Sequence, residues 1–266
     1  MFSTGRALVL HELQERIRDR WVLIITLLFA ALASGVALYG RSAAESAAAV
    51  TAPSIVTLTT FLVPLVALIL GHDAIVGERE RHTLGLLLSL PVQRGEVLLA
   101  KYLGRGLALS VSIGLGLGAA AIWLQPGQRR LIATLLPHTV LLGAAFLSIG
   151  VLLSVIAHRH ATAASLAVVT WFALVFFYDL GLLAALVATD GALAGADVGT
   201  LVALNPAGLF RSTLLLKLGI GGGFDGLGVE GLLPGSAVRA AVWAVWIVGP
   251  LVVGGLALGR RQAVQA

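Results

Sequence analysis

The sequence contains no cysteine, and its only methionine is the first residue. Without cysteine the chain has no disulfide, no zinc–thiolate site and no redox-active thiol. Charged residues are also scarce, at 12% of the 266 positions, which is about half the usual share in a soluble domain. A water-soluble globule is therefore excluded as the fold class.

Catalytic motifs are missing as well. The sequence has no GxSxG, no HExxH and no GxxxxGK[ST] pattern, so we expect no serine-hydrolase, zinc-protease or ATP-binding site. His158 and His160 lie at a predicted membrane boundary, where we expect an ordinary interfacial pair and no metal site. The net charge of +5 comes without interleaved aromatic residues, which argues against nucleic-acid binding. We expect no enzyme, and any ATP-driven work requires another subunit.

Apolar residues dominate the chain. They make up 58% of the sequence, the mean hydropathy is +0.98, and several apolar runs are long enough to cross a bilayer. Abundant glycine (32 residues) suits helices that approach each other closely in lipid. The sequence predicts an all-α membrane protein with six spans, at 21–40, 54–72, 103–125, 131–157, 162–188 and 237–258.

The basic residues predict the orientation of these spans. Residues 1–20 form an expected amphipathic helix on the membrane surface, with Leu10, Leu13 and Ile17 on one face; a solvated helix is the alternative. Six spans place both termini on one side, and that side holds twelve of the 18 Lys and Arg residues. We therefore expect both termini in the cytoplasm. The twelve are Arg6, Arg16, Arg18, Arg20, Arg79, Arg81, Arg94, Lys101, Arg105, Arg159, Arg260 and Arg261.

The cytoplasmic segment 73–102 is the most charged stretch. Thr83, which follows the acids Glu78 and Glu80, is predicted to be the N-cap of a short helix. This helix has an apolar face and ends at a proline. A second helix then starts and leads into the third span. Such a helix suits docking into a groove on a partner; an interfacial helix pair is the alternative. The residues of the apolar face, the proline and the second start are Leu84, Leu87, Leu88, Pro91, Arg94 and Lys101.

The external segment 189–236, which we expect in the periplasm, is long and rich in glycine. Asn205 and Pro206 predict the start of a helix that contains Arg211 and Lys217, and we expect Asn205, Pro206 and Arg211 to contact an outer partner. A simple connector is the alternative. Asp179, in the outer half of the fifth span, is expected to hydrogen-bond to a neighbouring helix, with a conduit or coupling role as the alternative.

Three further positions in or beside the second span are polar or helix-breaking. His72 and Asp73 lie at its cytoplasmic end, where capping of the helix is the favoured interpretation and metal binding the alternative. Pro64 is tolerable inside the span because neighbouring groups can satisfy the freed carbonyl.

The charged segment resembles the coupling segment of type-2 ABC transporter permeases in the residues named above, from Glu78 to Lys101. One departure is His82, where such proteins commonly have glycine. Four further runs are similar to the permeases of the nitrous oxide reductase maturation system: RDRWVLIITLLFA at 18–30, FLVPLVALILGHDAIVGE at 61–78, VFFYDLGLLA at 175–184 and LNPAGLFR at 204–211.

This resemblance implies a type-2 exporter fold in the bacterial inner membrane, acting as a homodimer. It further implies two copies of a cytoplasmic ATPase, which hold ATP and magnesium, and a periplasmic copper-delivering or scaffold protein. The output in that family is the copper–sulfur centre of nitrous oxide reductase. This chain itself is expected to bind no cofactor and no metal.

The cargo stays open at this point. A copper conduit needs thiolate, thioether or grouped imidazole ligands, and a chain with no cysteine and one methionine offers almost none. The alternatives are a type-2 exporter of a lipid or drug, an ion-coupled secondary transporter, which needs paired intramembrane acids, and a structural anchor, which needs no charged segment.

Overall fold

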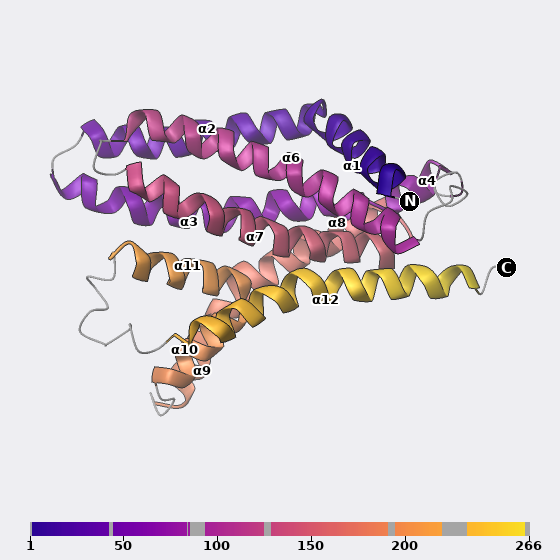
Figure 1. The fold of residues 1–266 in the computed structure, drawn as a ribbon. Coiled ribbons are helices and arrows are strands. Elements are labelled where there is room, and N and C mark those ends of the chain that lie inside the picture. Colours follow the sequence, from indigo (N-terminus) through magenta and orange to yellow (C-terminus); the bar gives the residue numbers. More distant parts are fainter. Residues whose placement is uncertain are drawn as a thin grey trace.

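The structure is a computed structural model that describes residues 2–42, 45–83, 85, 94–124, 129–190, 195–219 and 233–263. These ranges are helical, with no strand among them. Figure 1 shows an elongated bundle in which α1 and the end of α12 lie at one end. The helices are α1 (Phe2–Ile17), α2 (Arg20–Ser42), α3 (Glu45–His72), α4 (Val76–Glu80), α6 (Arg94–Trp123), α7 (Arg129–Ile156), α8 (His160–Phe172), the π-helical η2 (Ala173–Phe177), α9 (Tyr178–Ala188), α10 (Gly195–Leu204), α11 (Pro206–Lys217) and α12 (Ser236–Ala263).

Six helical stretches are long and apolar enough to cross a membrane, which confirms the predicted number of spans. They are Val22–Arg41, Thr51–Glu80, Gly95–Trp123, Arg130–Ile156, His160–Ala188 and Ser236–Gly259. The third span lies in α6. This helix begins at Arg94, earlier than the predicted start of the span at 103, because the charged turn around Lys101 belongs to the same helix. The fifth stretch combines α8, η2 and α9.

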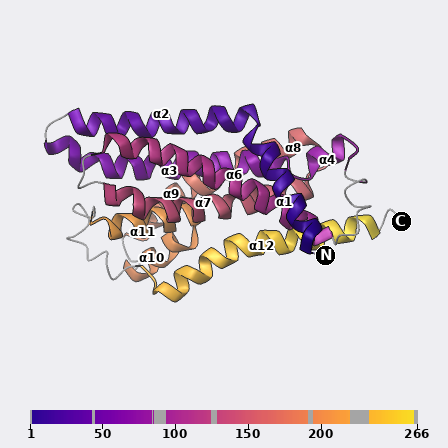
Figure 2. The same cartoon turned by 45° about the horizontal axis from the view of Figure 1, so that its top comes forward.

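Helices α3 and α7 form the centre of the bundle, and they pack closely at one glycine pair. A Cβ added at Gly71 would lie 2.8 Å from the backbone of Gly150, and one at Gly150 would lie 3.0 Å from the Cα of Gly71. Only glycine allows two helices to approach this closely. Figure 2 shows α2 on one side of this pair and α12 on the other, and α6 packs against α2.

Two spans that contain a proline are bonded near it by side chains of neighbouring helices. In α12, Pro250 leaves the carbonyl of Trp246 without its helical donor, and the Ser148 hydroxyl of α7 donates to this oxygen at 2.7 Å. In α3, Pro64 frees the carbonyl of Thr60, and the Trp171 indole of α8 donates at 2.9 Å to the neighbouring carbonyl of Phe61. These contacts connect α7 to α12 and α3 to α8.

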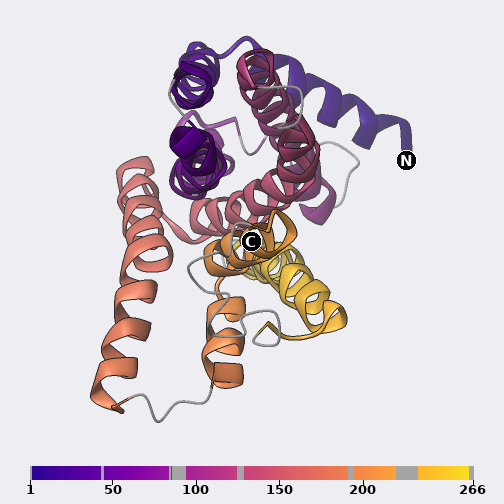
Figure 3. The ribbon, with the colours of Figure 1, turned by 90° about the vertical axis from the view of Figure 1, so that its left-hand side faces the viewer.

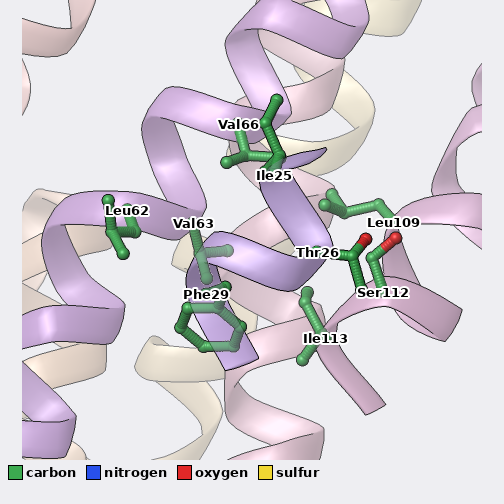
Figure 4. A pocket seen from close by; sticks show the side chains of 9 residues that line it. All are labelled: Ile25, Thr26, Phe29, Leu62, Val63, Val66, Leu109, Ser112 and Ile113. Carbon is green, nitrogen blue, oxygen red and sulfur yellow. The ribbon is translucent and has the colours of Figure 1, made fainter. Parts of the chain in front are cut away.

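A small apolar cavity of about 20 Å³ lies where α2, α3 and α6 meet. Figure 4 shows its lining side chains, which are mostly aliphatic. The hydroxyl of Thr26 donates to the carbonyl of Val22 at 2.7 Å, and that of Ser112 donates to the carbonyl of Ala108 at 3.0 Å. This cavity is too small and too apolar to be a cargo site.

Candidate functional site

Helix α1 crosses α6 at the end of the bundle that contains both termini, and Gly104 allows the close contact. A Cβ at position 104 would lie 2.7 Å from the Cβ of Glu12 and 3.0 Å from the carbonyl oxygen of Val9. Lys101 and Arg105 lie one turn or less from Gly104 on α6. The crossing therefore brings Glu12 directly against two cations.

Glu12 is buried and contacts three positive charges. Its carboxylate accepts hydrogen bonds from Arg105 Nε at 2.8 Å, Lys101 Nζ at 3.1 Å and Arg16 Nε at 3.4 Å. Burial alone would raise the pKa of Glu12, but Arg105, Lys101 and Arg16 outweigh it and lower the pKa of this carboxyl from 4.5 to about 2. Glu12 is therefore ionised at neutral pH, although only 4% of the residue is exposed to solvent.

Lys101 extends this contact to α4. Its Nζ also lies 2.9 Å from Glu78 Oε1, while the other oxygen of Glu78 accepts a hydrogen bond from the Thr83 hydroxyl. We call Glu12, Arg16, Glu78, Lys101 and Arg105 the Glu12 cluster. The cluster connects three helices, α1, α4 and α6, through buried or half-buried charges.

Arg105 connects the cluster to α3. This side chain is 1% exposed, and its guanidinium donates to the carbonyl of Leu70 near the end of α3 as well as to Glu12. A buried guanidinium requires such acceptors, because an unpaired charge in a dry interior is costly. Arg105 therefore fixes the position of α1 relative to α3 and α6.

Helix α4 is attached to the α7–α8 junction by hydrogen bonds of three side chains, Ser154, Arg79 and Glu80. The Ser154 hydroxyl accepts hydrogen bonds from the backbone N–H groups of Ile75 at 2.8 Å and Val76 at 2.9 Å. Arg79 donates to the carbonyl of Ala157 at 2.5 Å. The carboxylate of Glu80 accepts from the backbone N–H of His160 at 2.7 Å, which caps the first turn of α8.

Asp73 forms a second group of ion pairs beside α4. It lies 3.4 Å from Arg81, 3.5 Å from the His160 ring and 3.9 Å from Arg16. The His72 ring contacts the carbonyl of Ile69 at 2.6 Å. Among the described residues no group of three or more His, Asp or Glu side chains is arranged to hold a metal ion. The favoured interpretation, capping of the helix end, fits His72, whose ring contacts a carbonyl of the last turn of α3, whereas Asp73 pairs with side chains of other segments.

His82 adopts a left-handed backbone conformation, with a φ of 57°. Glycine adopts this region without strain and other residues do so at a cost. The turn after α4 therefore explains why glycine suits this position in the permeases that this segment resembles. Its geometry is formed here in spite of the substitution, since Thr83 N still donates to the carbonyl of Glu78 at 3.0 Å.

The predicted coupling residues divide into two groups. Glu78, Glu80, Thr83 and Lys101 lie together at this end of the bundle, with their polar groups bonded inside the chain. Arg94 is the first residue of α6, and its side chain lies outside the described part of the structure. Outside the described residues are also Leu84, Leu87, Leu88 and Pro91.

Sequence reasoning missed Glu12 and Arg105 as members of the site. The amphipathic pattern placed Glu12 away from the apolar face of α1 without giving it a partner, and Arg105 was counted only as a basic residue. The signal that was present is the spacing of Lys101 and Arg105, four residues apart and hence on one face of α6, at the edge of a long apolar helix.

A cavity of about 460 Å³ adjoins the Glu12 cluster. It is bordered by α1, the turn after α4 and the first turns of α6, and both charged and apolar groups line it. Its lining residues are Leu8, His11, Glu12, Glu15, Glu78, Arg81, Thr83, Val97, Ala100 and Lys101. This is a concave surface of mixed polarity beside the contact of Glu78 in α4 with Lys101 in α6.

At the opposite end of the bundle, Asn205 connects α11 to the fifth span. Its side-chain oxygen accepts from the N–H of Ala207 at 2.9 Å, and its amide donates to the carbonyl of Leu174 at 2.6 Å. Leu174 lies in η2, where the π-helical turn changes the ordinary bonding pattern. The predicted helix start at Asn205–Pro206 is therefore confirmed, and the cap has a second, tertiary partner.

Asp179 forms an ion pair with Arg211 of α11 at 2.8 Å, with a third of each side chain exposed. The expected bond from Asp179 to a neighbouring helix is thus present. Asn205 and Pro206, in contrast, are buried, so the predicted contact of these two residues with an outer partner is corrected to an internal structural role. The buried position results from packing of α11 against α7 and α3.

Comparisons with known proteins identify the family of the chain. The ABC-2 family transporter protein family matches residues 6–262. The probable ABC transporter permease protein NosY of Pseudomonas aeruginosa is 38% identical over 249 residues, which cover 89% of this chain and 88% of that protein. The protein of the same name from Stutzerimonas stutzeri is 40% identical over 248 residues, with 89% and 88% covered. The chain belongs to the ABC-2 transporter family and is a membrane-spanning permease.

Proposed function

We propose that this permease transmits the work of a cytoplasmic ABC ATPase to a periplasmic step in the maturation of the copper–sulfur centre of nitrous oxide reductase. The observation that supports coupling is the Glu12 cluster, in which Lys101 lies 3.1 Å from Glu12 and 2.9 Å from Glu78. The similarity to proteins named NosY supports the particular pathway.

The coupling step begins where α4 leads into residues 84–93. An ATPase that moves this segment pulls on Glu78 and Thr83, and Lys101 passes the displacement to α6 and to Glu12 of α1. Helix α6 is a single helix from Arg94 to Trp123, so a tilt at one end moves the other end. Buried charges suit this role because separating one pair would leave an unpaired buried charge, which is costly. The helices joined by the Glu12 cluster therefore move together.

A second route leads from α4 to the fifth span. Ser154, Arg79 and Glu80 hold α4 against the start of α8, and α8 continues through η2 into α9. Asn205 then connects η2 to α11. A rotation of α8 is therefore transmitted to the external helices, where a periplasmic partner binds.

The fifth span supports a homodimer as the working form. It is the least buried of the six candidate spans, with 6% of its most apolar window buried inside the chain. The partly exposed pair of Asp179 and Arg211 is costly against acyl chains, so this face of the span needs water or protein beside it. A second copy of this chain supplies that surrounding, and the dimer binds two copies of the ATPase at its cytoplasmic end.

The permease itself supplies movement and no copper site in this proposal. Copper(I) requires soft ligands, and the sequence has no cysteine and a single methionine. Copper is handled by the outer partner. Both termini then lie in the cytoplasm of a bacterium, with α10 and α11 toward the periplasm, in line with the excess of basic residues on the side of the termini.

Coupling is tested in the purified complex of permease and ATPase. Lys101→Met should leave the ATPase bound and reduce the permease-dependent part of its ATP hydrolysis at least ten-fold. Glu78→Ala and Glu80→Ala should weaken co-purification of the ATPase, because both disturb the attachment of α4. The matched control is Arg130→Gln, an exposed cation at the other end of the bundle. Normal hydrolysis and assembly in all three variants would remove the coupling assignment.

The pathway is tested in cells, through the copper content and absorption spectrum of nitrous oxide reductase. Deletion of the gene should abolish the copper–sulfur centre and leave the other copper site filled. A fully loaded reductase in the deletion strain would leave an ABC-2 permease with a different cargo, such as a lipid or drug.

A further inference from the structure

The charges of α1 are divided between two sides of the helix. The acids Glu12, Glu15 and Asp19 all lie within 3.7 Å of Arg16. Three other arginines are exposed: Arg6 of α1, Arg18 in the turn after it and Arg20, the first residue of α2. They form no ion pair with any other residue that the structure describes. The surface around this helix therefore has an excess of positive charge.

Two large apolar side chains of α1 are on the face that points away from the bundle. Leu10 is 55% exposed and Ile17 is 42% exposed, while Glu12 on the opposite side is 4% exposed. Arg6, Leu10 and Ile17 follow the i, i+4, i+11 spacing of one helical face. We call the surface made by these three residues, together with Arg18 in the following turn and Arg20 at the start of α2, the outer face of α1.

The outer face of α1 continues into a surface that lipid covers. Leu23 and Ile24, at the start of the first span, are 50% and 53% exposed, and acyl chains are the solvent of such a span. Figure 3, a view along the bundle, shows α1 running crosswise to the spans and outward from them. A helix in this position lies at the level where the first span enters the bilayer.

We propose that the outer face of α1 binds anionic phospholipid head groups of the membrane leaflet on that side. The apolar side chains enter the boundary between head groups and acyl chains, and the arginines lie against the phosphates. Each basic residue near an anionic leaflet strengthens such binding about five-fold. Because Glu12 is on the other side of the same helix, lipid binding presses Glu12 onto Lys101 and Arg105. The proposal concerns the lipid alone and does not depend on an ATPase.

The absence of cysteine from the sequence makes this binding measurable in the full chain. Gln14 is exposed on α1, and Gln14→Cys provides one site for a fluorophore. The labelled protein is placed in nanodiscs of phosphatidylcholine with rising fractions of phosphatidylglycerol, and quenching by lipids with a nitroxide near the head group is recorded. Quenching should rise with the anionic fraction and fall when salt shortens the screening length from about 10 Å at 0.1 M to about 3 Å at 1 M.

The charge variant R6Q/R18Q/R20Q should lose about 100-fold in the equilibrium for the lipid-bound position of α1 and show little dependence on phosphatidylglycerol. These side chains are exposed, so the variant keeps the fold, which its elution volume and helical content confirm. The matched control is R41Q/R130Q, two exposed arginines outside α1, which should behave like the parent. Equal quenching in neutral and anionic nanodiscs would overturn the proposal. Shielding of the label only when ATPase is added would also overturn it, since the outer face would then bind protein.

Discussion

The strongest prediction concerns Glu12, because one carboxylate balances several buried cations. Replacing it by glutamine keeps the size of the side chain and removes the charge opposite Arg105, which is 1% exposed. Arg105 then keeps the Leu70 carbonyl and a neutral amide oxygen as acceptors, but the carboxylate that balanced its charge is gone. Removing one partner of a buried ion pair typically costs about 3–5 kcal/mol.

The pKa of Glu12 gives an independent value for the same contribution. A pKa lowered from 4.5 to about 2 corresponds to about 3 kcal/mol of stabilisation at neutral pH. Because the pKa is lower in the folded state, this stabilisation is complete above about pH 4.5 and is lost as the pH falls toward 2. Glu12→Gln should therefore lower the free energy of unfolding by about 3 kcal/mol at pH 7 and by much less near pH 2.

A double-mutant cycle in detergent micelles measures the coupling, with unfolding by a denaturing detergent followed by circular dichroism. Glu12→Gln and Arg105→Gln should each destabilise the chain, and the double variant should be about 2 kcal/mol more stable than the sum of the two effects predicts. The matched control is Glu15→Gln, on the same helix with 44% of its side chain exposed and 3.7 Å from Arg16, which should cost less than about 1 kcal/mol. Additive effects of Glu12→Gln and Arg105→Gln would refute the role assigned to the cluster.

Three further substitutions test single contacts by the same unfolding assay. His82→Gly should stabilise the chain by about 1 kcal/mol, since the φ of 57° strains any residue but glycine; a loss of stability would contradict the turn geometry. Gly104→Val should cost about 1–3 kcal/mol because its side chain would overlap Glu12, and an unchanged midpoint would show that α1 does not pack there. Asn205→Ala should cost about 1–2 kcal/mol for the lost cap. Asn205→Asp keeps the acceptor for Ala207 but loses the donor to Leu174, so if Asn205→Asp is as stable as the parent, the η2 contact has no role in stability.

Local properties of the sequence were sufficient for the spans and for several helix ends. Hydropathy summed over a window predicted all six candidate spans, since burial in lipid depends on composition over about 20 residues and not on a particular neighbour. The start of α11 followed from Asn205 and Pro206, because a helix cap is formed within a few residues. The unusual character of His82 was also visible, as a departure from glycine.

The functional arrangement depended on contacts between distant parts of the chain. Glu12 and Arg105 are 93 positions apart, and Asn205 and Leu174 are 31 apart. The pattern of α1 alone gives Glu12 no partner, because the partner is provided only when Gly104 lets α6 approach. The same holds for Asn205, which the sequence marks as a cap and the fold buries.

The sequence by itself thus determined a six-span permease with a charged segment after the second span. Spans and caps result from interactions between a residue and its solvent or its next few neighbours. Only the tertiary structure decided which charges meet, because a buried ion pair forms where two helices cross at a distance that glycine permits. That crossing of α1 and α6 makes Glu12 the centre of a buried charge cluster.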